Sequence, residues 1–311
     1  MFLPILCGTL AFLAILGFAL SGFIIKKRPS RKHDIHEYMR SNLPEGEWDA
    51  LLKRYNNSDK QVLELKSPFG YIVKGYAVFV HPESKKWIVL SHGVTASKTR
   101  SLMYASIFDG LGFNYCIYDH RYHGDTQGKN ISYGYYERHD LKLIADEIKK
   151  RYSPEILGIH GESMGSGIAL LYAGSIEDGA DFYIIDCPYD NFYEEVRYRF
   201  ACALPLPLFM QNLILSFTDL FIRLRAGFSL KEVNPSLYTK NIKNPVLFIT
   251  SKEDTYIPPS MTQNLYDLKK EGIKKLYIAE KGGHAQAYIE NPEEYKKEVT
   301  DFLKEIFPSS F

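Results

Sequence analysis

The pattern Gly-x-Ser-x-Gly at residues 161–165 has the residue types and the spacing of a turn that presents a nucleophile. An apolar run precedes it at 156–160, and a small-residue run of helical character follows at 167–173. A sharp turn between a strand and a helix lifts a serine hydroxyl clear of the sheet and aims the next backbone N–H at a developing acyl oxyanion. The pattern therefore predicts Ser163 as a nucleophile and Met164 as an oxyanion donor.

Two other interpretations of this turn exist. A dinucleotide-binding turn is also rich in glycine, but it requires G-x-G-x-x-G and an acidic residue about twenty positions later. The glycines of this chain have a different spacing and lie in mid-chain. The other alternative is a tight turn with a surface serine. The remaining members of a serine triad distinguish these interpretations, because a hydrolase of this type has an acid and then a histidine later in the chain.

An acid and a histidine do follow in that order. Residues 245–250 have the composition of a buried strand, and Asp254 comes soon after its end. Residues 275–279 suggest the next strand, which His284, the last histidine of the chain, follows. In a triad the histidine takes the serine proton while the acid holds the imidazole in the required tautomer. We therefore predict Asp254 and His284 as the partners of Ser163.

Three alternatives concern the acid. Glu253 lies one position away and has the same chemistry. Asp186 follows the apolar residues 182–185, and some hydrolases place their acid one strand earlier. Asp254 could also be only a turn residue ahead of two prolines.

A second oxyanion donor is expected after the strand predicted at residues 86–90. That strand ends in a His-Gly turn formed by His92 and Gly93. Such a turn usually supplies a backbone N–H to the oxyanion, and Val94 is the expected donor. His92 itself is more typical of a structural turn histidine.

Another group of polar residues follows the strand predicted at 114–118. His120 and His123 together with Asp119 or Asp125 form a conceivable metal site. No further ligand cluster with metal spacing accompanies them. We therefore expect no metal and no cofactor.

The amino terminus predicts a membrane anchor. Residues 1–25 carry no charged side chain, and about twenty apolar residues span a bilayer as a helix. The basic segment Lys26–Lys32 follows directly, which by the positive-inside rule favours a cytoplasmic domain, although large domains cross regardless of such charges. A cleaved signal peptide with a site at residues 19–21 is the alternative, but it should carry charge before a shorter apolar core.

These motifs together resemble the α/β-hydrolase superfamily over roughly residues 61–307. The residues that carry the resemblance are His92, Gly93, Asp119, Arg121, His123, Gly124, Gly161, Ser163, Gly165, Asp254 and His284. With its apolar amino terminus, the chain resembles the single-pass, membrane-anchored bacterial serine hydrolases described as cell-surface hydrolases. The resemblance implies an α/β fold with a mostly parallel, eight-stranded sheet covered by helices, a Ser163–His284–Asp254 triad, and an extracytoplasmic domain. The second motif of this set runs from Asp119 to Gly124. Tyr122 within it and Thr126 just after it stand where the superfamily more often has glycine and serine.

Length and composition fit one large domain with an appendage. The chain has 311 residues and a net charge of +1. Its overall charge therefore does not favour nucleic acid as a partner. Three cysteines outside the anchor make no disulfide framework. We predict an anchor at 1–25, a linker at 26–60 and a hydrolase domain at 61–311 with a lid inserted at 188–244.

The lid should contain an apolar helix over residues 208–224. Four polar residues in this helix share one stripe and should face water: Asn212, Ser216, Asp219 and Arg223. The wide apolar remainder should cover something apolar, either the sheet domain, an acyl pocket or lipid. Its largest members are Phe209, Leu213, Phe217, Leu220 and Phe221.

The predicted function is hydrolysis of a carboxylic ester through an acyl-enzyme. The expected partners are a small acyl substrate and, through the amino-terminal helix, membrane lipid. A thioesterase, a peptidase or an acyltransferase on the same triad is an alternative, because the fold does not choose among these. A non-catalytic, membrane-tethered binding protein is a further alternative, but it would normally have lost a triad residue.

Overall fold

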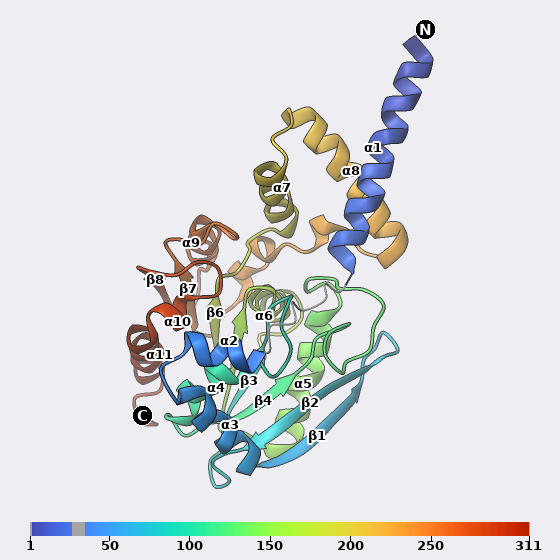
Figure 1. Ribbon diagram of the computed structural model, residues 1–311. Coiled ribbons are helices and arrows are strands. Elements are labelled where there is room, and N and C mark those ends of the chain that lie inside the picture. Colours follow the sequence, from blue (N-terminus) through green and yellow to red (C-terminus); the bar gives the residue numbers. More distant parts are fainter. Residues whose placement is uncertain (1, 27–34, 311) are drawn as a thin grey trace.

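A twisted sheet of eight strands forms the centre of the molecule (Figure 1). The computed structural model describes residues 2–26 and 35–310, with side chains from Cys7 onward. The strands are β1 (Asp59–Lys66), β2 (Ile72–Phe79), β3 (Lys86–Ser91), β4 (Asn114–Tyr118), β5 (Ile156–Glu162), β6 (Phe182–Asp186), β7 (Val246–Ser251) and β8 (Lys274–Ala279). Their order is β1-β2-β4-β3-β5-β6-β7-β8. The β1–β2 and β2–β4 pairs are antiparallel and all others are parallel, which confirms the predicted fold class.

Helices cover both faces of this sheet. They are α1 (Phe2–Ile25), α2 (Ile35–Asn42), α3 (Glu47–Asn57), α4 (Leu102–Asp109), α5 (Glu137–Tyr152), α6 (Met164–Ser175), α7 (Phe192–Ala203), α8 (Leu208–Ala226), α9 (Pro259–Leu268), α10 (Ala287–Glu290) and α11 (Pro292–Ile306). Three short 3₁₀ helices are η1 (Leu230–Glu232), η2 (Pro235–Leu237) and η3 (Thr239–Asn241). One core cluster holds α5 and α6, and the other holds α4 and α11. Strands β4 to β7 are buried along their whole length, as expected for a sheet covered on both faces.

The segment that precedes β1 is folded onto the domain. Residues 35–57, which the sequence suggested as linker, form α2 and α3. Trp48 and Leu51 of α3 are buried in the core cluster that contains α4. This part of the expected linker is therefore helical, and α3 contributes apolar burial to the domain.

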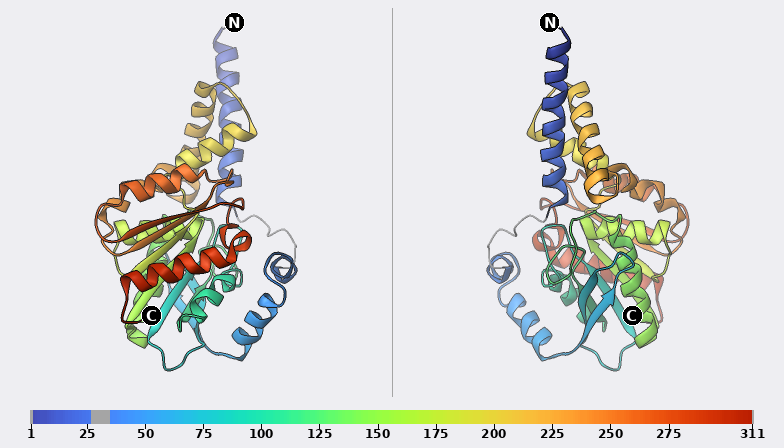
Figure 2. Two further views of the ribbon diagram at one scale, coloured as in Figure 1. Left: turned by 90° about the vertical axis from the view of Figure 1, so that its left-hand side faces the viewer. Right: turned by 90° about the vertical axis from the view of Figure 1, so that its right-hand side faces the viewer.

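The apolar helix α1 projects from the domain with α7 and α8 beside it (Figures 1 and 2). A Cβ atom on Gly17 would lie 2.5 Å from the Cβ atom of Phe217, so glycine permits the close approach of α1 and α8. The Arg225 guanidinium donates to the Ser21 hydroxyl at 2.7 Å. The Tyr133 hydroxyl donates to the Ile24 carbonyl oxygen at 2.9 Å. The carboxyl half of α1 is thus packed against the lid and the domain.

The length and composition of Cys7–Ile25 suit a membrane span, although a signal sequence near an amino terminus has the same properties. Most of the predicted basic cluster, residues 27–32, lies outside the described residues.

Helix α8 forms where the sequence predicts it, but the expected exposure of Asp219 is wrong. Phe209 is 71% exposed and Leu220 is 47% exposed, so the described residues do not enclose these two side chains. Asp219, expected to face water, is half-buried and accepts hydrogen bonds from Ser229 and Leu230. The reason is that α8 packs on α1 and the domain through a single face, which holds Ile214, Leu215 and Ile222. A second apolar face remains open.

Candidate active site

The turn between β5 and α6 holds Ser163 in an unusual backbone conformation. Its φ of 55° and ψ of −113° lie outside the regions that ordinary residues favour, at a cost of about 1–3 kcal/mol. A Cβ atom on Gly161 would lie 2.6 Å from the backbone of Gly165, and one on Gly165 would lie 2.0 Å from the Ser91 carbonyl oxygen. Both glycines are therefore required by packing. The Ser163 N–H donates to the Asp186 carbonyl oxygen at 2.8 Å, which ties the turn to β6.

The structure brings Ser163, His284 and Asp254 into one hydrogen-bonded row. Ser163 Oγ lies 2.8 Å from His284 Nε2, and His284 Nδ1 lies 2.8 Å from Asp254 Oδ2. The other oxygen of Asp254 accepts backbone N–H groups from Tyr256 and Ile257, each at 2.9 Å. These partners assign the ring proton to Nδ1, so Nε2 is free to accept the serine proton.

The two alternative acids have other contacts. Glu253 accepts the Gly282 N–H at 3.1 Å. Asp186 lies below the nucleophile turn and accepts the hydroxyl of Tyr295 at 3.1 Å. Burial, together with the charge of Glu162, raises the pKa of Asp186 to about 8. Of the three candidate carboxylates, the one hydrogen-bonded to His284 is that of Asp254.

The loop after β3 brings Val94 to the same place. Val94 and Met164 line one pocket with Ser163. Met164 is the first residue of α6, so its N–H has no acceptor within the helix. His123 Nε2 lies 2.6 Å from the Val94 carbonyl oxygen, and His92 Nε2 accepts the His120 N–H at 3.1 Å. These histidine contacts hold the loop in position.

The motif from Asp119 to Gly124 holds this loop through hydrogen bonds and an ion pair. Asp119 accepts the Lys98 N–H at 2.8 Å and the Lys98 ammonium at 2.5 Å. It also accepts the Asp125 N–H at 2.9 Å. A Cβ atom on Gly124 would collide with the Asp119 carboxylate, and φ at Gly124 is +43°. The motif therefore joins the turn at Gly124 to the segment that carries Val94.

Three of the four ring nitrogens of His120 and His123, the candidate metal ligands, face protein oxygens, and His120 Nδ1 is buried without a partner among the described residues. His120 Nε2 lies 3.1 Å from the Ser91 hydroxyl, and His123 Nδ1 lies 2.9 Å from the Arg121 carbonyl oxygen. A different group has ligand atoms within 4.8 Å of one another: Cys187, Asp254 and His284. Burial raises the pKa of the Cys187 thiol well above its usual range, so this side chain is a neutral thiol where no metal is bound. Asp254 and His284 bond each other, an arrangement that suits proton transfer.

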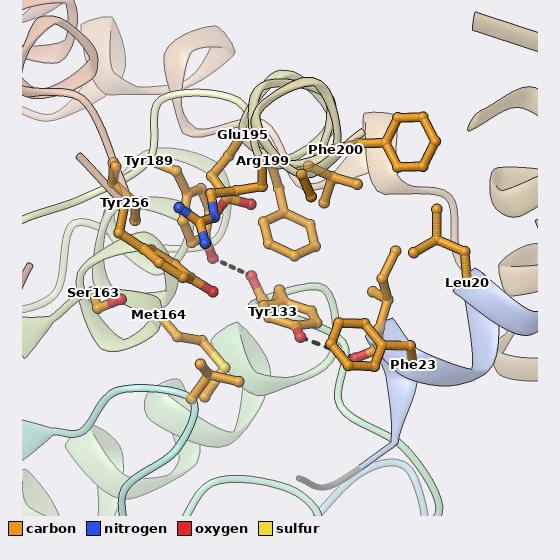
Figure 3. A pocket seen from close by; sticks show the side chains of 16 residues that line it. Leu20, Phe23, Tyr133, Ser163, Met164, Tyr189, Glu195, Arg199, Phe200 and Tyr256 are labelled. Carbon is orange, nitrogen blue, oxygen red and sulfur yellow. Dashed lines mark hydrogen bonds between the residues drawn. The ribbon is translucent and has the colours of Figure 1, made fainter. Parts of the chain in front are cut away.

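Ser163 lies at one end of an apolar pocket of about 280 Å³ (Figure 3). Leu20 and Phe23 of α1 lie at the other end, where Phe200 of α7 faces them. The full lining is Leu20, Phe23, Ile24, Val94, Tyr133, Ser163, Met164, Tyr189, Phe192, Glu195, Val196, Arg199, Phe200, Ala203, Tyr256 and Ile257. An acyl chain therefore has an apolar path away from the serine.

The sequence did not indicate several of these lining residues. Glu195 and Arg199 lie one helical turn apart on α7, and Arg199 stacks over the Tyr256 ring at 4.1 Å. The charged pattern of α7 resembles that of any surface helix, so no local signal marked them. Leu20 and Phe23 belong to the predicted anchor, and only packing reveals that they also form a pocket wall.

Comparisons with known proteins agree with this geometry. The family described as serine aminopeptidase, S33, matches residues 82–213. The uncharacterized protein YqkD of Bacillus subtilis (strain 168) is 41% identical over 289 residues, covering 92% of this chain and 88% of that protein. The lysophosphatidylserine lipase ABHD12 of Danio rerio is 26% identical over 219 residues, covering 65% of this chain and 53% of that protein.

Solved structures share the fold. The Pyrococcus furiosus esterase Pf2001 superposes with a TM-score of 0.66 at 22% identity, covering 83% of this chain and 94% of that chain. The substrate-analogue complex of DcsB superposes with a TM-score of 0.60 at 23% identity, covering 79% and 99%. The chain belongs to the α/β-hydrolase superfamily. It is a serine-type hydrolase of that class.

Proposed function

We propose that the protein hydrolyses carboxylic esters through an acyl-enzyme, with Ser163 as nucleophile, His284 as base and Asp254 as the orienting acid. The observation that carries the proposal is the continuous row from Ser163 Oγ through the His284 ring to Asp254, with 2.8 Å at each step. This row ends at an apolar pocket that suits an acyl group. The lipase and esterase names of the similar proteins support the same class of substrate.

The reaction follows from these positions. Ser163 Oγ attacks the ester carbonyl carbon while His284 Nε2 takes its proton, and Asp254 stabilises the imidazolium. The N–H groups of Val94 and Met164 stabilise the oxyanion, each worth about 10²–10³ in rate. The C–O bond to the leaving alcohol then breaks as His284 returns the proton to that oxygen. Water attacks the acyl-enzyme through the same steps and releases the acid.

A fluorophosphonate probe tests the nucleophile. The full chain should be labelled, and Ser163→Ala should abolish labelling, because only an activated serine reacts. Ser175→Ala, on the far end of α6, is the matched control and should label normally. A panel of nitrophenyl esters should be hydrolysed by the wild type and by the control. Labelling that survives in Ser163→Ala would overturn the assignment.

A second candidate is an aminopeptidase. The matching family carries that description, and Glu195 places a carboxylate on the pocket wall, which suits a substrate α-amine. Arg199 on the same face offsets that negative charge, so we favour the ester. Alanine nitroanilide distinguishes the two: an aminopeptidase would cleave it faster than the matching ester, and Glu195→Gln would raise its KM selectively.

We also propose that α1 remains attached as a membrane anchor. Ser21 is fully buried and bonds Arg225, so cleavage near residues 19–21 would remove a partner of the lid. Leu20, which lines the pocket, would be lost with it. A cleaved and released signal peptide would not contribute residues to the substrate pocket of the mature enzyme, so these contacts support an uncleaved helix.

A further inference from the structure

The tip of the hairpin formed by α7 and α8 has the composition of a lipid-facing segment. Residues 200–218 contain no charged side chain. Several apolar side chains of this tip are exposed: Leu204 is 43% exposed, Leu208 59%, Phe209 71% and Leu213 36%. A single exposed apolar residue is ordinary, but a contiguous group on one projecting element indicates an interaction surface.

The hairpin tip lies beside the helix that suits a membrane span. Figure 2 shows α7 and α8 projecting from the sheet domain in the direction of α1 in both views. Gly17 of α1 is in contact with Phe217 of α8, and Phe18 packs edge-on against Phe221 at 5.3 Å. Residues toward the start of α8 therefore lie beside residues toward the start of α1. If α1 is in a bilayer, the hairpin tip cannot remain in bulk water.

Charged residues flank this apolar surface. They begin at Arg199 on α7, at Asp219 on α8 and at Lys26 after α1. Asp219 is turned toward Ser229, whereas Arg223 is exposed and able to reach lipid headgroups. The charge-free part of α8, residues 208–218, rises about 15 Å at 1.5 Å per residue. That is about half of a ~30 Å hydrocarbon core, so the tip fits one leaflet.

The polar side chains of this stretch are compatible with that depth. The Gln211 amide donates to the Leu206 carbonyl oxygen at 2.7 Å, and the Ser216 hydroxyl donates to the Asn212 carbonyl oxygen at 2.7 Å. The Thr218 hydroxyl donates to the Ile214 carbonyl oxygen at 2.9 Å. Backbone oxygens thus accept from three of the four amide and hydroxyl side chains of residues 200–218, and the exposed Asn212 is the fourth.

We propose that residues 200–218 insert into the lipid leaflet that faces the domain, and that the pocket takes its ester from that leaflet. The outer pocket wall is built from the same two segments, Leu20 and Phe23 of α1 and Phe200 and Ala203 of α7. Phe23 is 58% exposed, so the wall continues into the surface that would contact lipid. The substrate class is an acyl ester of a membrane-resident amphiphile, whose chain passes between α1 and α7 toward Ser163. The substrate part of this inference rests on the proposed esterase function.

The native cysteines allow a direct test of insertion. Cys202 is exposed on the tip, whereas Cys116 and Cys187 are buried. In full-length Cys7→Ser protein reconstituted in phosphatidylglycerol–phosphatidylethanolamine vesicles, an NBD label on Cys202 should be quenched by spin-labelled lipid. The control adds Cys202→Ser and Val62→Cys, which moves the label to β1, where Val62 is 60% exposed. That label should be quenched by aqueous iodide. Equal iodide quenching at both positions would overturn the insertion.

A second arm tests the source of the substrate. Leu208→Asp with Phe209→Asp places charge in the tip without altering the pocket lining. The double variant should lower hydrolysis of monooleoylglycerol in vesicles at least about tenfold, because carboxylates are costly to place in hydrocarbon. Soluble nitrophenyl butyrate should be hydrolysed within about twofold of wild type, since catalysis is separate from membrane partition. Leu237→Asp, at a 55% exposed apolar position on η2, is the matched control.

The outcomes separate the two proposals. Equal loss on both substrates, or no loss on the vesicle substrate, would overturn uptake from the leaflet while leaving the esterase intact. Failure of wild type to hydrolyse either ester would overturn the proposed function and the substrate class with it, and the Cys202 label would still decide insertion.

Discussion

His123 Nε2 lies 2.6 Å from the carbonyl oxygen of Val94, a contact that joins the turn after β4 to the loop after β3. The opposite ring nitrogen lies 2.9 Å from the Arg121 carbonyl oxygen. The imidazole therefore bridges two backbone segments and touches no group of the triad. If the Val94 N–H stabilises the oxyanion, His123 acts through the position of that loop.

We predict that His123→Ala lowers kcat about 10–100-fold for nitrophenyl esters, because a displaced oxyanion donor loses transition-state stabilisation. KM should change less than kcat, since Val94 is the pocket residue on this loop and the rest of the lining lies on other segments. His139→Ala, at a half-buried position on α5, is the control. A larger KM effect than kcat effect would show that the loop shapes the pocket instead.

The three candidate acids give distinct expectations. Asp254→Asn should lower kcat by about 10⁴, because the imidazole loses its required tautomer. Glu253→Gln should stay within about tenfold, since Glu253 bonds only the Gly282 N–H among the described residues. Steady-state kinetics on nitrophenyl butyrate compares them. A greater loss in Asp186→Asn than in Asp254→Asn would assign the acid to β6.

Asp186 should make the stability of the fold depend on pH. Its pKa is raised to about 8 in the folded protein, chiefly by burial, from an ordinary value of 3.8. Between these two values the folded state binds more protons than the unfolded state, so unfolding free energy falls as pH rises, by up to about 1.4 kcal/mol per pH unit. Urea titrations from pH 5 to pH 8 should show this fall in wild type. Asp186→Asn should reduce this slope without abolishing it, because burial also raises the pKa of Asp140 to about 7. An unchanged slope would contradict the assignment.

Pocket-facing residues of α7 should control acyl length. Val196 is 8% exposed and lines the pocket. Val196→Asn should raise KM for octanoate esters about tenfold and for acetate esters less than about twofold, because longer chains pass more of the wall. Arg197→Asn, on the partly exposed side of the same helix, should affect neither. Equal effects of Val196→Asn on all chain lengths would mean that α7 is only structural cover.

The anchor is tested in cells. The chain should stay in the membrane after carbonate extraction with Met1 or Phe2 at its amino terminus, because α1 is long enough to span a bilayer. A mature chain beginning near Gly22 would contradict the anchor. The basic residues after α1 predict a cytoplasmic domain, so a reporter fused after Phe311 should be active in the cytoplasm. Digestion of the domain by protease added to intact cells would contradict the cytoplasmic orientation but not the membrane anchor.

The sequence by itself determined the fold class and nominated the residues of the hydrogen-bonded row. Gly161, Ser163 and Gly165 are a local signal, because a strand–turn–helix elbow leaves no room for side chains at the two glycines. Strand ends in a parallel sheet meet at one edge, so the order of Ser163, Asp254 and His284 along the chain was enough to predict their meeting.

Only the tertiary structure decided which of three carboxylates faces the histidine, because Glu253 and Asp254 differ by one position along a turn whose direction no local pattern encodes. It also decided what covers α8. The helical spacing of the polar residues in 208–224 correctly predicted a helix. Periodicity shows that a face is apolar, but it does not show which segment packs against that face. That α1 packs on one face of α8 while Phe209 and Leu224 stay exposed follows from contacts between segments about two hundred residues apart, which no sequence window spans.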